Sequence, residues 1–315
     1  MPGPAIKLGL IGAGRWGRNI IRTIAGLPDA RLAAIASRNP ATAALVPPDC
    51  RIVTDWRALI DLNDIDGVII ASPPATHAEM LIAAIGRNRP ALVEKPVVTT
   101  WADVQRLRAL LDGAETTILV DHTHLFHPAF RALQREAARL GPIRSIASAA
   151  GNRGPYRTDV SVLWDWAPHD IAMCLALVPG RCGAARATRL ASRPVDGAMA
   201  ETLALQLELA GGVPARIRLS TLDERHRWFA VQFDAGTLVY RDQGAAQLTR
   251  LAPGADLQSP GTALPVTDEP PLSRAIRDFV QAVRSGDRDR GSIELGLAVV
   301  EAILAIEQGI DRPAG

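Results

Sequence analysis

Lys95, Asp165 and His169 are the candidates for acid–base chemistry, because their side chains can hold or move protons. Lys7 and Lys95 are the only lysines, and every other cation among the 35 lysines and arginines is an arginine. A partly buried lysine can shift its pKa and handle a proton, whereas arginine stays charged. Histidine has an ordinary pKa of about 6.5, which suits a base near neutral pH. Asp165 precedes His169 by four residues, so on a helix its carboxylate would share a face with the imidazole and could orient it. The three residues predict acid–base chemistry, although Lys95 alone is equally compatible with surface charge.

The surroundings of His169 leave two points open. Pro168 predicts that a helix begins close to this position, since proline favours the first helical turn. Asp170 would then be either a ligand of a substrate hydroxyl or an acid in the first helical turn with no chemical role.

The elements before Lys95 predict a nucleotide-binding α/β domain. An apolar run over residues 6–11 leads directly into Gly12-Ala13-Gly14-Arg15-Trp16-Gly17, and a helical pattern follows to about residue 27. In such a strand–turn–helix context the first glycine permits a tight turn, the second lets the backbone approach a pyrophosphate, and the third lets helix pack on strand. Further strands are expected at 31–36, 68–71, 91–93 and 117–120, with helices at 77–87 and 101–112. The alternation predicts a parallel, doubly wound sheet with ligands at the carboxyl ends of its strands.

The residues after the second strand favour NADP over NAD. NAD-specific folds usually place an acid here to bind the ribose 2′-hydroxyl. Ser37 and Arg38 instead offer a hydroxyl and a guanidinium, which suit a 2′-phosphate. Arg38 could alternatively stack on the adenine of NAD, so NAD stays possible.

Composition excludes some classes of function. The chain has 315 residues, a formal net charge of +2 and 48% hydrophobic residues, with no long basic run. Nucleic-acid binding is therefore not indicated. We expect no signal peptide and no membrane-spanning segment, because no apolar stretch is long enough, and three cysteines without metal or C-x-x-C spacing favour reduced thiols. We expect a cytoplasmic protein that does not bind membranes.

Four segments together resemble the Gfo/Idh/MocA family, the glucose-fructose oxidoreductase and inositol dehydrogenase group. They are GAGRWG at 12–17, SPPATH at 72–77, EKP at 94–96 and WDWAPHD at 164–170, and the similarity extends over nearly the whole chain. The resemblance implies a Rossmann domain, placed at residues 1–121, and an α/β domain with a large, open, mainly antiparallel sheet at 122–315, whose last helices return toward the first domain.

The resemblance also implies NAD(P)-dependent oxidoreduction of a sugar or related polyol, with Lys95, Asp165 and His169 as the catalytic set. By the same resemblance Glu94 and Lys95 lie near the nicotinamide ribose, and the Lys95–Pro96 bond is a candidate for the cis form. The resulting candidate cofactor-binding residues are Gly12, Gly14, Arg15, Trp16, Gly17, Ser37, Arg38, Ser72, Pro73, Thr76, His77, Glu94 and Lys95.

The second domain supplies the candidate substrate-binding residues His127, Arg153, Tyr156 and Asp170. His127 follows the nearby His122 and His124, which invites a metal interpretation. No other cysteine or histidine shows complementary spacing, so we expect no metal. We favour a segment that lines the cleft, and a plain crossover segment without a role in binding is the alternative. At the position of His127, members of the family often carry Asn or Asp. Because His127 departs from that pattern, its contact with the substrate is left open. The loop with Arg153 and Tyr156 suits a polar, anionic substrate, although a solvated loop with surface salt bridges is the alternative.

Strands in this domain are expected near 143–150, 184–193, 201–209, 214–221, 228–234 and 236–241. Residues 242–270 are expected to form loops with at most short strands, and helices are expected at 272–285 and 291–309. Two helices cannot cover both faces of a six-stranded sheet, so we expect a homodimer or homotetramer formed through the open face.

The sequence therefore predicts an enzyme that transfers a hydride between a nicotinamide and a carbinol or keto carbon of a sugar, nucleotide-sugar or cyclic polyol. Because hydride leaves a carbinol carbon only if the hydroxyl proton also leaves, His169 would accept that proton while Lys95 donates a hydrogen bond to the oxygen. Two alternatives remain. One is a glycoside-cleaving enzyme that recycles its NAD internally, and the other is a regulator that binds dinucleotide and sugar without catalysis.

Overall fold

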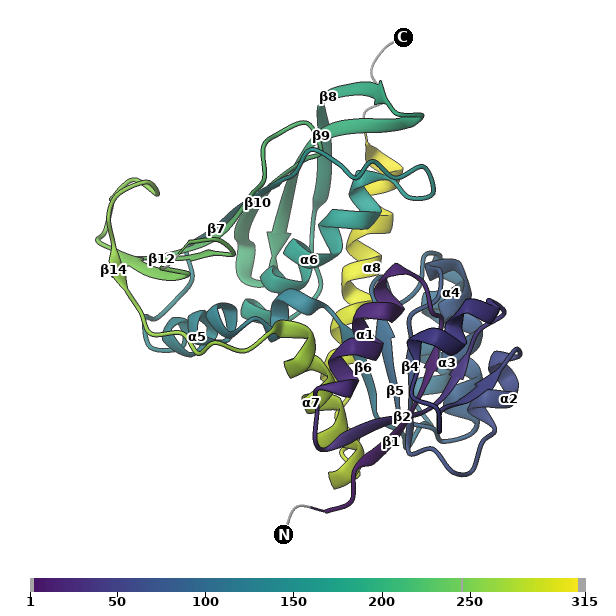
Figure 1. The fold of residues 1–315 in the computed structure, drawn as a ribbon. Coiled ribbons are helices and arrows are strands. Elements are labelled where there is room, and N and C mark those ends of the chain that lie inside the picture. The colour runs from purple at the N-terminus through teal and green to yellow at the C-terminus, as the bar shows by residue number, and fades with distance from the viewer. Residues whose placement is uncertain (1–2, 245, 311–315) are drawn as a thin grey trace. The chain divides into compact units, whose positions relative to one another are not determined.

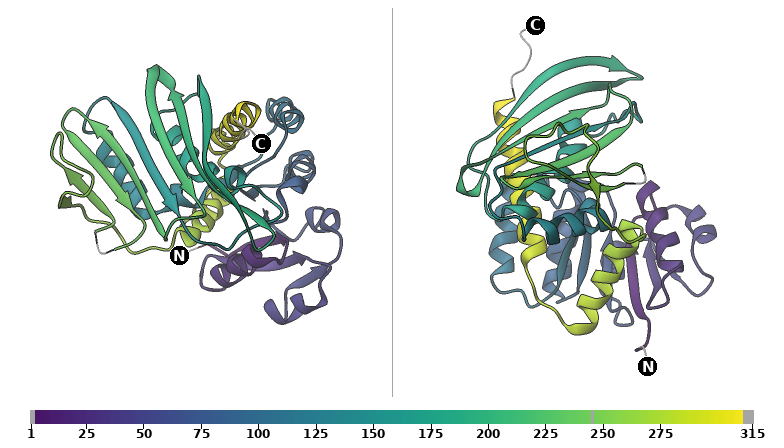
Figure 2. Two further views of the ribbon diagram at one scale, coloured as in Figure 1. Left: turned by 90° about the horizontal axis from the view of Figure 1, so that it is seen from above. Right: turned by 90° about the vertical axis from the view of Figure 1, so that its left-hand side faces the viewer.

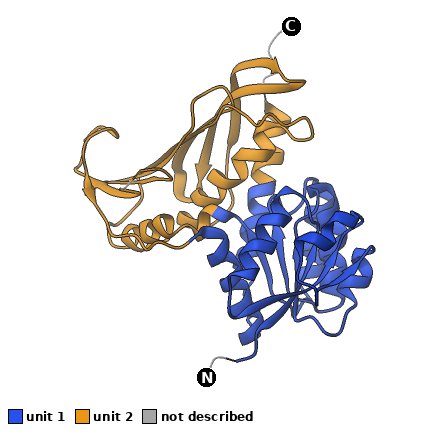
Figure 3. Ribbon diagram, viewed as in Figure 1, with its two compact units in different colours: residues 1–123, 270–300 blue, residues 124–269, 301–315 orange. Residues whose placement is uncertain are grey.

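The chain folds into two compact units, seen in a computed structural model that describes residues 3–244 and 246–310 (Figure 3). Unit 1 contains Met1–Thr123 and Pro270–Val300, and unit 2 contains His124–Glu269 and Glu301–Gly315. A single boundary after residue 121 does not describe this division, because residues 270–300 belong to unit 1.

Unit 1 is built on a six-stranded sheet in the order β3-β2-β1-β4-β5-β6, with every pairing parallel (Figure 1). The strands are β1 Ile6–Ile11, β2 Ala30–Ala36, β3 Arg51–Val53, β4 Gly67–Ile70, β5 Ala91–Glu94 and β6 Ile118–Asp121. All four residues of β4 are buried, as expected for a parallel strand covered on both faces. This strand order is that of the Rossmann fold, which confirms the predicted fold of the first domain.

Helices lie on both faces of this sheet. They are α1 Arg15–Ala25, α2 Trp56–Ile60, α3 His77–Gly86, α4 Trp101–Leu111, α7 Pro271–Ser285 and the first part of α8 Gly291–Gly309, with short 3-10 helices η1 Pro40–Leu45 and η2 Pro74–Thr76. Helices α1 and α7 lie on one face, and α2, α3 and α4 lie on the other (Figure 1). At the edge of the sheet the Val120 N–H of β6 donates to the Ser292 hydroxyl at the start of α8 (2.9 Å).

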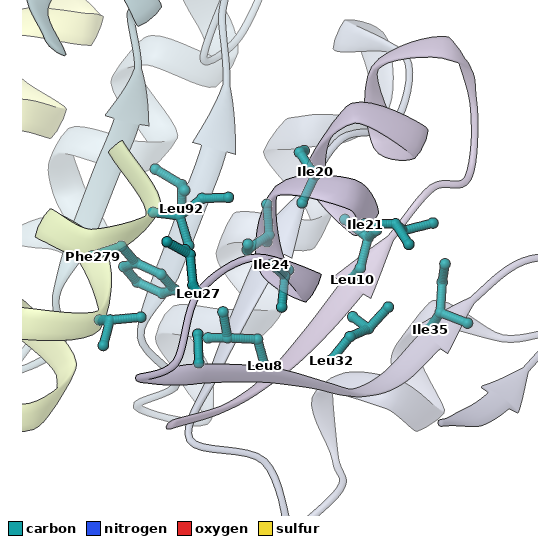
Figure 4. Close-up of a cluster of buried hydrophobic side chains, with 14 of the residues drawn as sticks. Leu8, Leu10, Ile20, Ile21, Ile24, Leu27, Leu32, Ile35, Leu92 and Phe279 are labelled. Carbon is teal, nitrogen blue, oxygen red and sulfur yellow. The ribbon is translucent and has the colours of Figure 1, made fainter. Parts of the chain in front are cut away.

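The core of unit 1 explains why α7 belongs to it. Phe279 of α7 is fully buried in the same cluster as Leu8 of β1 and Ile24 of α1 (Figure 4). Burying one such aromatic side chain contributes about 1.5–3 kcal/mol. Residues far apart in the sequence therefore complete one hydrophobic core.

Unit 2 contains an eight-stranded sheet in the order β14-β13-β12-β11-β7-β10-β9-β8. The strands are β7 Ser145–Gly151, β8 Ala185–Val195, β9 Ala198–Leu209, β10 Val213–Ser220, β11 His226–Phe233, β12 Gly236–Arg241, β13 Leu248–Leu251 and β14 Thr262–Ala263. Only the pairing of β7 with β10 is parallel among those described, so the sheet is mixed and mostly antiparallel, as predicted. Gly211 and Gly212 adopt φ values of 73° and 76° in the hairpin between β9 and β10, a region that glycine enters without strain.

The helices of unit 2 lie along one face of its sheet (Figure 2). They are α5 Pro128–Ala137, α6 Val162–Leu177 and the last part of α8. Two short 3-10 helices complete the elements: η3 Thr123–Phe126, which begins at the last residue of unit 1 before residue 124, and η4 Ala210–Gly212, in the turn between β9 and β10. Helix α5 packs on β12 and β13, and α6 packs on β9 and β10.

Two expectations for unit 2 were wrong. The sheet has eight strands rather than six, because two short strands extend it beyond β12. Leu248–Leu251 pairs with β12 and buries both of its leucines, and Thr262–Ala263 pairs with Leu248–Leu251. Helix α6 begins at Val162 rather than near Pro168. Ser161 caps it by accepting a hydrogen bond from the Trp164 N–H (3.4 Å), and Pro168 removes only one donor inside a helix that is buried along most of its length.

Candidate functional site

The turn after β1 leaves room for a ligand at one glycine and none at the other two. A Cβ at Gly12 would lie 2.5 Å from the Ala71 oxygen, and one at Gly17 would collide with the Gly12 oxygen. Gly12 also has a φ of 103°. A Cβ at Gly14 would meet no atom within 4 Å. Packing of the protein itself therefore requires Gly12 and Gly17, whereas Gly14 borders open space.

The N-terminus of α1 is suited to an anion. Its N-cap, Gly14, provides no side-chain hydrogen bond, and its first turn contains no acidic residue. Arg15 is exposed there and Trp16 is 38% exposed. Amides without a side-chain cap, together with the helix dipole, favour a phosphate at such a position. The turn thus fits the pyrophosphate of a dinucleotide.

Ser37 and Arg38 follow β2 as predicted. The Ser37 hydroxyl lies 2.7 Å from the hydroxyl of Thr42 and accepts a hydrogen bond from the Asn39 N–H (3.2 Å). Thr42 is fully buried and anchors Ser37, a contact that the sequence pattern did not indicate. Arg38 is exposed, so its guanidinium is available to a ligand.

Hydrogen bonds hold the turn after β4 in one conformation. The Ser72 hydroxyl lies 2.8 Å from that of Thr76, and the Thr76 hydroxyl lies 2.7 Å from the Pro73 oxygen. Pro73 and Thr76 are exposed. The predicted contact residues of this turn, His77 excepted, are therefore accessible from the carboxyl end of β4.

His77 is fully buried and braces two turns. Its Nδ1 lies 2.9 Å from the Pro96 oxygen, and its Nε2 lies 2.9 Å from the Ser72 oxygen. Burial lowers the pKa of His77, while the two backbone carbonyls act in the opposite direction. The structure thus places this predicted cofactor-binding residue as a link between the turns after β4 and β5.

Glu94 is the last residue of β5, Lys95 and Pro96 follow it, and the Lys95–Pro96 peptide bond is cis. Glu94 is opposite Asp121 in the ladder between β5 and β6. Burial raises the pKa of Glu94 well above its ordinary value, and the neighbouring Asp121 raises it further, while Lys95 and the Trp16 indole lower it. Asp121 was not predicted as a site residue, because its proximity depends on the pairing of two strands.

In unit 2, Asp165 and His169 lie on one continuous helix, α6, four residues apart and hence on one face. Arg157 contacts the Asp165 carboxylate at 3.2 Å and the Asp159 carboxylate at 2.7 Å. The Arg157 guanidinium therefore links the two carboxylates.

Three aromatic side chains gather beside His169. The rings of His124 and His169 are 5.0 Å apart, edge to face. The Nδ1 of His124 lies 3.3 Å from the hydroxyl of Tyr240, and the rings of His127 and Tyr240 are also 5.0 Å apart. His127 accepts a hydrogen bond from the Ala129 N–H (3.1 Å) and so caps α5, and burial lowers its pKa. Sequence reasoning noted His124 but assigned it no contact with the predicted base.

The other predicted substrate-binding residues have different surroundings. Asp170 is fully buried and pairs with Arg227 at 2.7 Å. It lies beyond the second turn of α6, so it is not a first-turn acid. Arg153 is exposed and pairs with Glu224 at 2.9 Å, and Tyr156 lies partly buried in the same loop as Arg153.

Neither a metal cluster nor a membrane span was found. Across residues 3–244 and 246–310, no group of three or more His, Cys, Asp or Glu side chains is arranged to hold a metal ion. Within the same residues no helix has both the length and the apolar character needed to cross a bilayer.

Comparisons with known proteins agree with this fold. The family model described as an oxidoreductase family with an NAD-binding Rossmann fold, GFO_IDH_MocA, matches residues 6–122. A crystal structure of an inferred oxidoreductase from Magnetospirillum magnetotacticum MS-1 is 44% identical, has a TM-score of 0.89, and is matched over 96% of this chain and 99% of that one.

Two curated relatives carry activity names. Inositol 2-dehydrogenase 2 of Saccharopolyspora erythraea is 30% identical over 53% of this chain and 52% of its own length, so the match spans about half of that relative. D-xylose 1-dehydrogenase (NADP(+)) 2 of Haloferax volcanii is 26% identical over 98% of both chains. With its Rossmann strand order, its glycine turn and these matches, the chain belongs to the Gfo/Idh/MocA family of oxidoreductases.

Proposed function

We propose that this protein is an NAD(P)-dependent dehydrogenase or reductase that acts on a CH–OH group of a sugar, nucleotide-sugar or cyclic polyol. The single observation that carries the proposal is the glycine turn. Gly14 faces open space at a helix start without a side-chain cap, while Gly12 and Gly17 are required by packing. A dinucleotide's pyrophosphate fits these features. The names of the inositol and xylose dehydrogenases support the substrate class.

The bound nicotinamide would supply a hydride acceptor or donor, and the chain's own residues would handle the proton. In the direction of oxidation, a ring nitrogen of His169 accepts the proton of the substrate hydroxyl. Asp165, held by Arg157 at 3.2 Å, orients the imidazole and stabilises its charged form. The Lys95 ammonium donates a hydrogen bond to the oxygen on which charge develops.

The proposed cofactor is NADP, with NAD as the weaker ligand. Exposed Arg38 and anchored Ser37 follow β2, and neither they nor Asn39 provides a carboxylate for a 2′-hydroxyl. The H. volcanii relative, whose name specifies NADP(+), supports this preference. The remaining cofactor contacts are assigned to Arg15, Trp16, Ser72, Pro73, Thr76 and Glu94.

The substrate contacts and the assembly are also proposals. His127, Arg153, Tyr156 and Asp170 keep their assignment to substrate binding, although Asp170 would act while paired with Arg227. We further propose a homodimer or homotetramer formed through the sheet face of unit 2 that α5 and α6 leave open.

The test is the change in nicotinamide absorbance with NADP⁺ or NAD⁺ against inositols, free aldoses and UDP-sugars, and with keto-sugars in reverse. We expect net turnover with one substrate group, and loss of at least about 100-fold in His169→Ala because general base catalysis is removed. Cofactor binding should be unchanged in that variant. Tight cofactor binding without turnover of any substrate would contradict the proposal and favour an internally recycling enzyme or a sensor.

A further inference from the structure

A buried threonine fixes the direction of the hydrogen bond that it shares with Ser37, just after β2. Thr42 is fully buried, and its Oγ1 lies 2.7 Å from the Oγ of Ser37. Within residues 3–244 and 246–310, Ser37 is the one hydrogen-bond partner of the Thr42 hydroxyl. A buried donor without an acceptor is rare and costly, whereas an oxygen with a spare lone pair is tolerated. Thr42 therefore donates its proton, and the Ser37 oxygen accepts it.

The Ser37 oxygen has no further capacity to accept. Besides the Thr42 proton it accepts a hydrogen bond from the Asn39 N–H at 3.2 Å. A hydroxyl oxygen has two lone pairs, and the protein itself uses both of them here. Ser37 is only partly buried, so its own proton is what it can offer to a ligand.

Asn39 is left with donors in the same way. Its Oδ1 accepts a hydrogen bond from the Ala41 N–H (3.0 Å), and its main-chain oxygen accepts one from the Thr42 N–H (3.0 Å). Asn39 is exposed, so its side chain presents the two N–H donors of its amide group. The short helix η1 adds no anion site of its own, because Pro40 has no N–H and the Ala41 N–H is already used.

Three consecutive side chains thus present donors and no free acceptor. They are the Ser37 hydroxyl, the exposed Arg38 guanidinium, which contains no acceptor, and the Asn39 amide. The oxygens of a 2′-phosphate accept hydrogen bonds and match this set. A ribose 2′-hydroxyl has a proton of its own, for which the set provides no acceptor. A polar group that is imperfectly paired in a complex weakens binding, so the set favours the phosphate.

We infer that Thr42 is a positioning residue that sets the cofactor specificity of this turn. By donating to Ser37, it prevents that oxygen from accepting the 2′-hydroxyl proton of NAD and directs the Ser37 proton to the 2′-phosphate of NADP. The inference rests on the proposed function, in which the turn after β2 binds the adenosine ribose of the cofactor.

The test removes the Thr42 hydroxyl and measures the binding of two nucleotides that differ only in the 2′-phosphate, 2′,5′-ADP and 5′-AMP. Thr42→Val keeps the branched shape of the buried side chain. In calorimetric titrations we expect its affinity for 2′,5′-ADP to fall about 3- to 10-fold, on the scale of one neutral hydrogen bond. Its affinity for 5′-AMP should stay the same or rise, because the Ser37 oxygen becomes free to accept the 2′-hydroxyl proton.

Two further substitutions of Thr42 complete the series. Thr42→Ser keeps the hydroxyl and should bind both nucleotides as the wild type does. Thr42→Ala removes the hydroxyl without inserting a methyl group in its place, and should repeat the result of Thr42→Val even if valine impairs folding. An unchanged or higher affinity for 2′,5′-ADP without the hydroxyl would overturn the inference, because the Ser37 proton would then be directed to Thr42 in the wild type.

A double-mutant cycle separates this role from a merely structural one. Ser37→Ala removes the oxygen through which Thr42 acts, so Thr42→Val should have no further effect on 2′,5′-ADP affinity in that background. Losses of equal size in both backgrounds would overturn the inference. Thr116→Val is the matched control, at a buried threonine that precedes β6 and so lies at the amino ends of the strands. It should leave both affinities unchanged.

Neither nucleotide contains a nicotinamide, so these results decide the inference whether or not the protein transfers a hydride. A wild type that binds 2′,5′-ADP no more tightly than 5′-AMP would overturn the inference, yet turnover with NAD⁺ would still establish the proposed dehydrogenase. Conversely, the expected binding changes without turnover of any substrate would refute only the proposed function.

Discussion

Ser37 and Arg38 carry the proposed cofactor preference, and their substitution tests it. In Ser37→Asp/Arg38→Ala a carboxylate replaces the hydroxyl and the guanidinium is removed. Loss of a charge-assisted contact to the 2′-phosphate, worth about 1.5–3 kcal/mol, should weaken NADP⁺ binding by about 10- to 150-fold. NAD⁺ binding should stay the same or improve. Titration calorimetry with both nucleotides measures the two affinities.

Arg31→Ala provides the control for that variant. Arg31 is an exposed arginine near the start of β2 and pairs with Asp49 at 3.2 Å. Its loss should leave both affinities unchanged. Equal weakening of NAD⁺ and NADP⁺ in the double variant, or no weakening of NADP⁺, would contradict the assignment of Ser37 and Arg38.

Residue types and short spacings predicted the candidate site residues. They could not predict contacts between residues that are far apart in the sequence. The motif could place Glu94 beside Lys95, whereas its ladder partner Asp121 is 27 residues away in the chain and is known only once β5 pairs with β6. Similarly, the buried ion pair between Asp170 and Arg227 joins α6 to β11, and the two residues are 57 positions apart in the sequence. No local pattern encodes such partners.

At the scale of elements, the β1–α1 turn makes a prediction with its own internal control. Gly17→Ala places a Cβ against the Gly12 oxygen, whereas Gly14→Ala places one in open space. We expect Gly17→Ala to lower the free energy of unfolding by about 1–3 kcal/mol, the usual cost of a forced steric contact. Gly14→Ala should unfold almost as the wild type does, yet bind NADP⁺ at least about tenfold more weakly, because the backbone can no longer approach the pyrophosphate.

Denaturant unfolding and nucleotide titration of the two variants separate these effects. A Gly14→Ala protein with normal NADP⁺ affinity would show that the open space beside Gly14 is not where the pyrophosphate binds. Equal destabilisation by both substitutions would contradict the packing described for Gly17.

Elements with long, periodic patterns were predicted well, and those defined by a few residues were not. The strand at 201–209 alternates clearly and is observed within β9 Ala198–Leu209. The strand Leu248–Leu251 has only four residues in a segment rich in Pro and Gly, so its pairing with β12 could not be anticipated. Pro168 suggested a helix start, but tertiary burial of α6 outweighs the single hydrogen bond that proline removes.

At the scale of the whole molecule, His122 should make stability depend on pH. Its folded-state pKa is about 3, below the ordinary value of about 6.5, so the unfolded chain binds more protons between these values. The contribution of neutral His122 is therefore fully present above about pH 6.5 and is lost as pH falls, at up to about 1.4 kcal/mol per pH unit. His122→Gln should remove this part of the slope.

The measurement is urea unfolding of the wild type and of His122→Gln from about pH 4 to about pH 7. This range covers most of the interval between the folded and the ordinary pKa of histidine. The difference between the two stability profiles reports on His122 alone. The raised pKa values of Glu94 and Asp121 change stability with pH in the opposite direction, and they contribute to both profiles. Parallel pH profiles for the wild type and His122→Gln would contradict the burial of a neutral imidazole at the end of β6.

The most direct test of the central claim, hydride transfer between a nicotinamide and a sugar-type carbon, is a label-transfer measurement. NADPH carrying deuterium at both C4 positions is incubated with keto-sugars and keto-inositols, and the products are analysed by mass spectrometry. The account predicts a hydroxyl product that contains one deuterium on the new carbinol carbon, and a greatly reduced yield in His169→Ala. Bound NADPH with no deuterium in any product of the wild-type protein would contradict it.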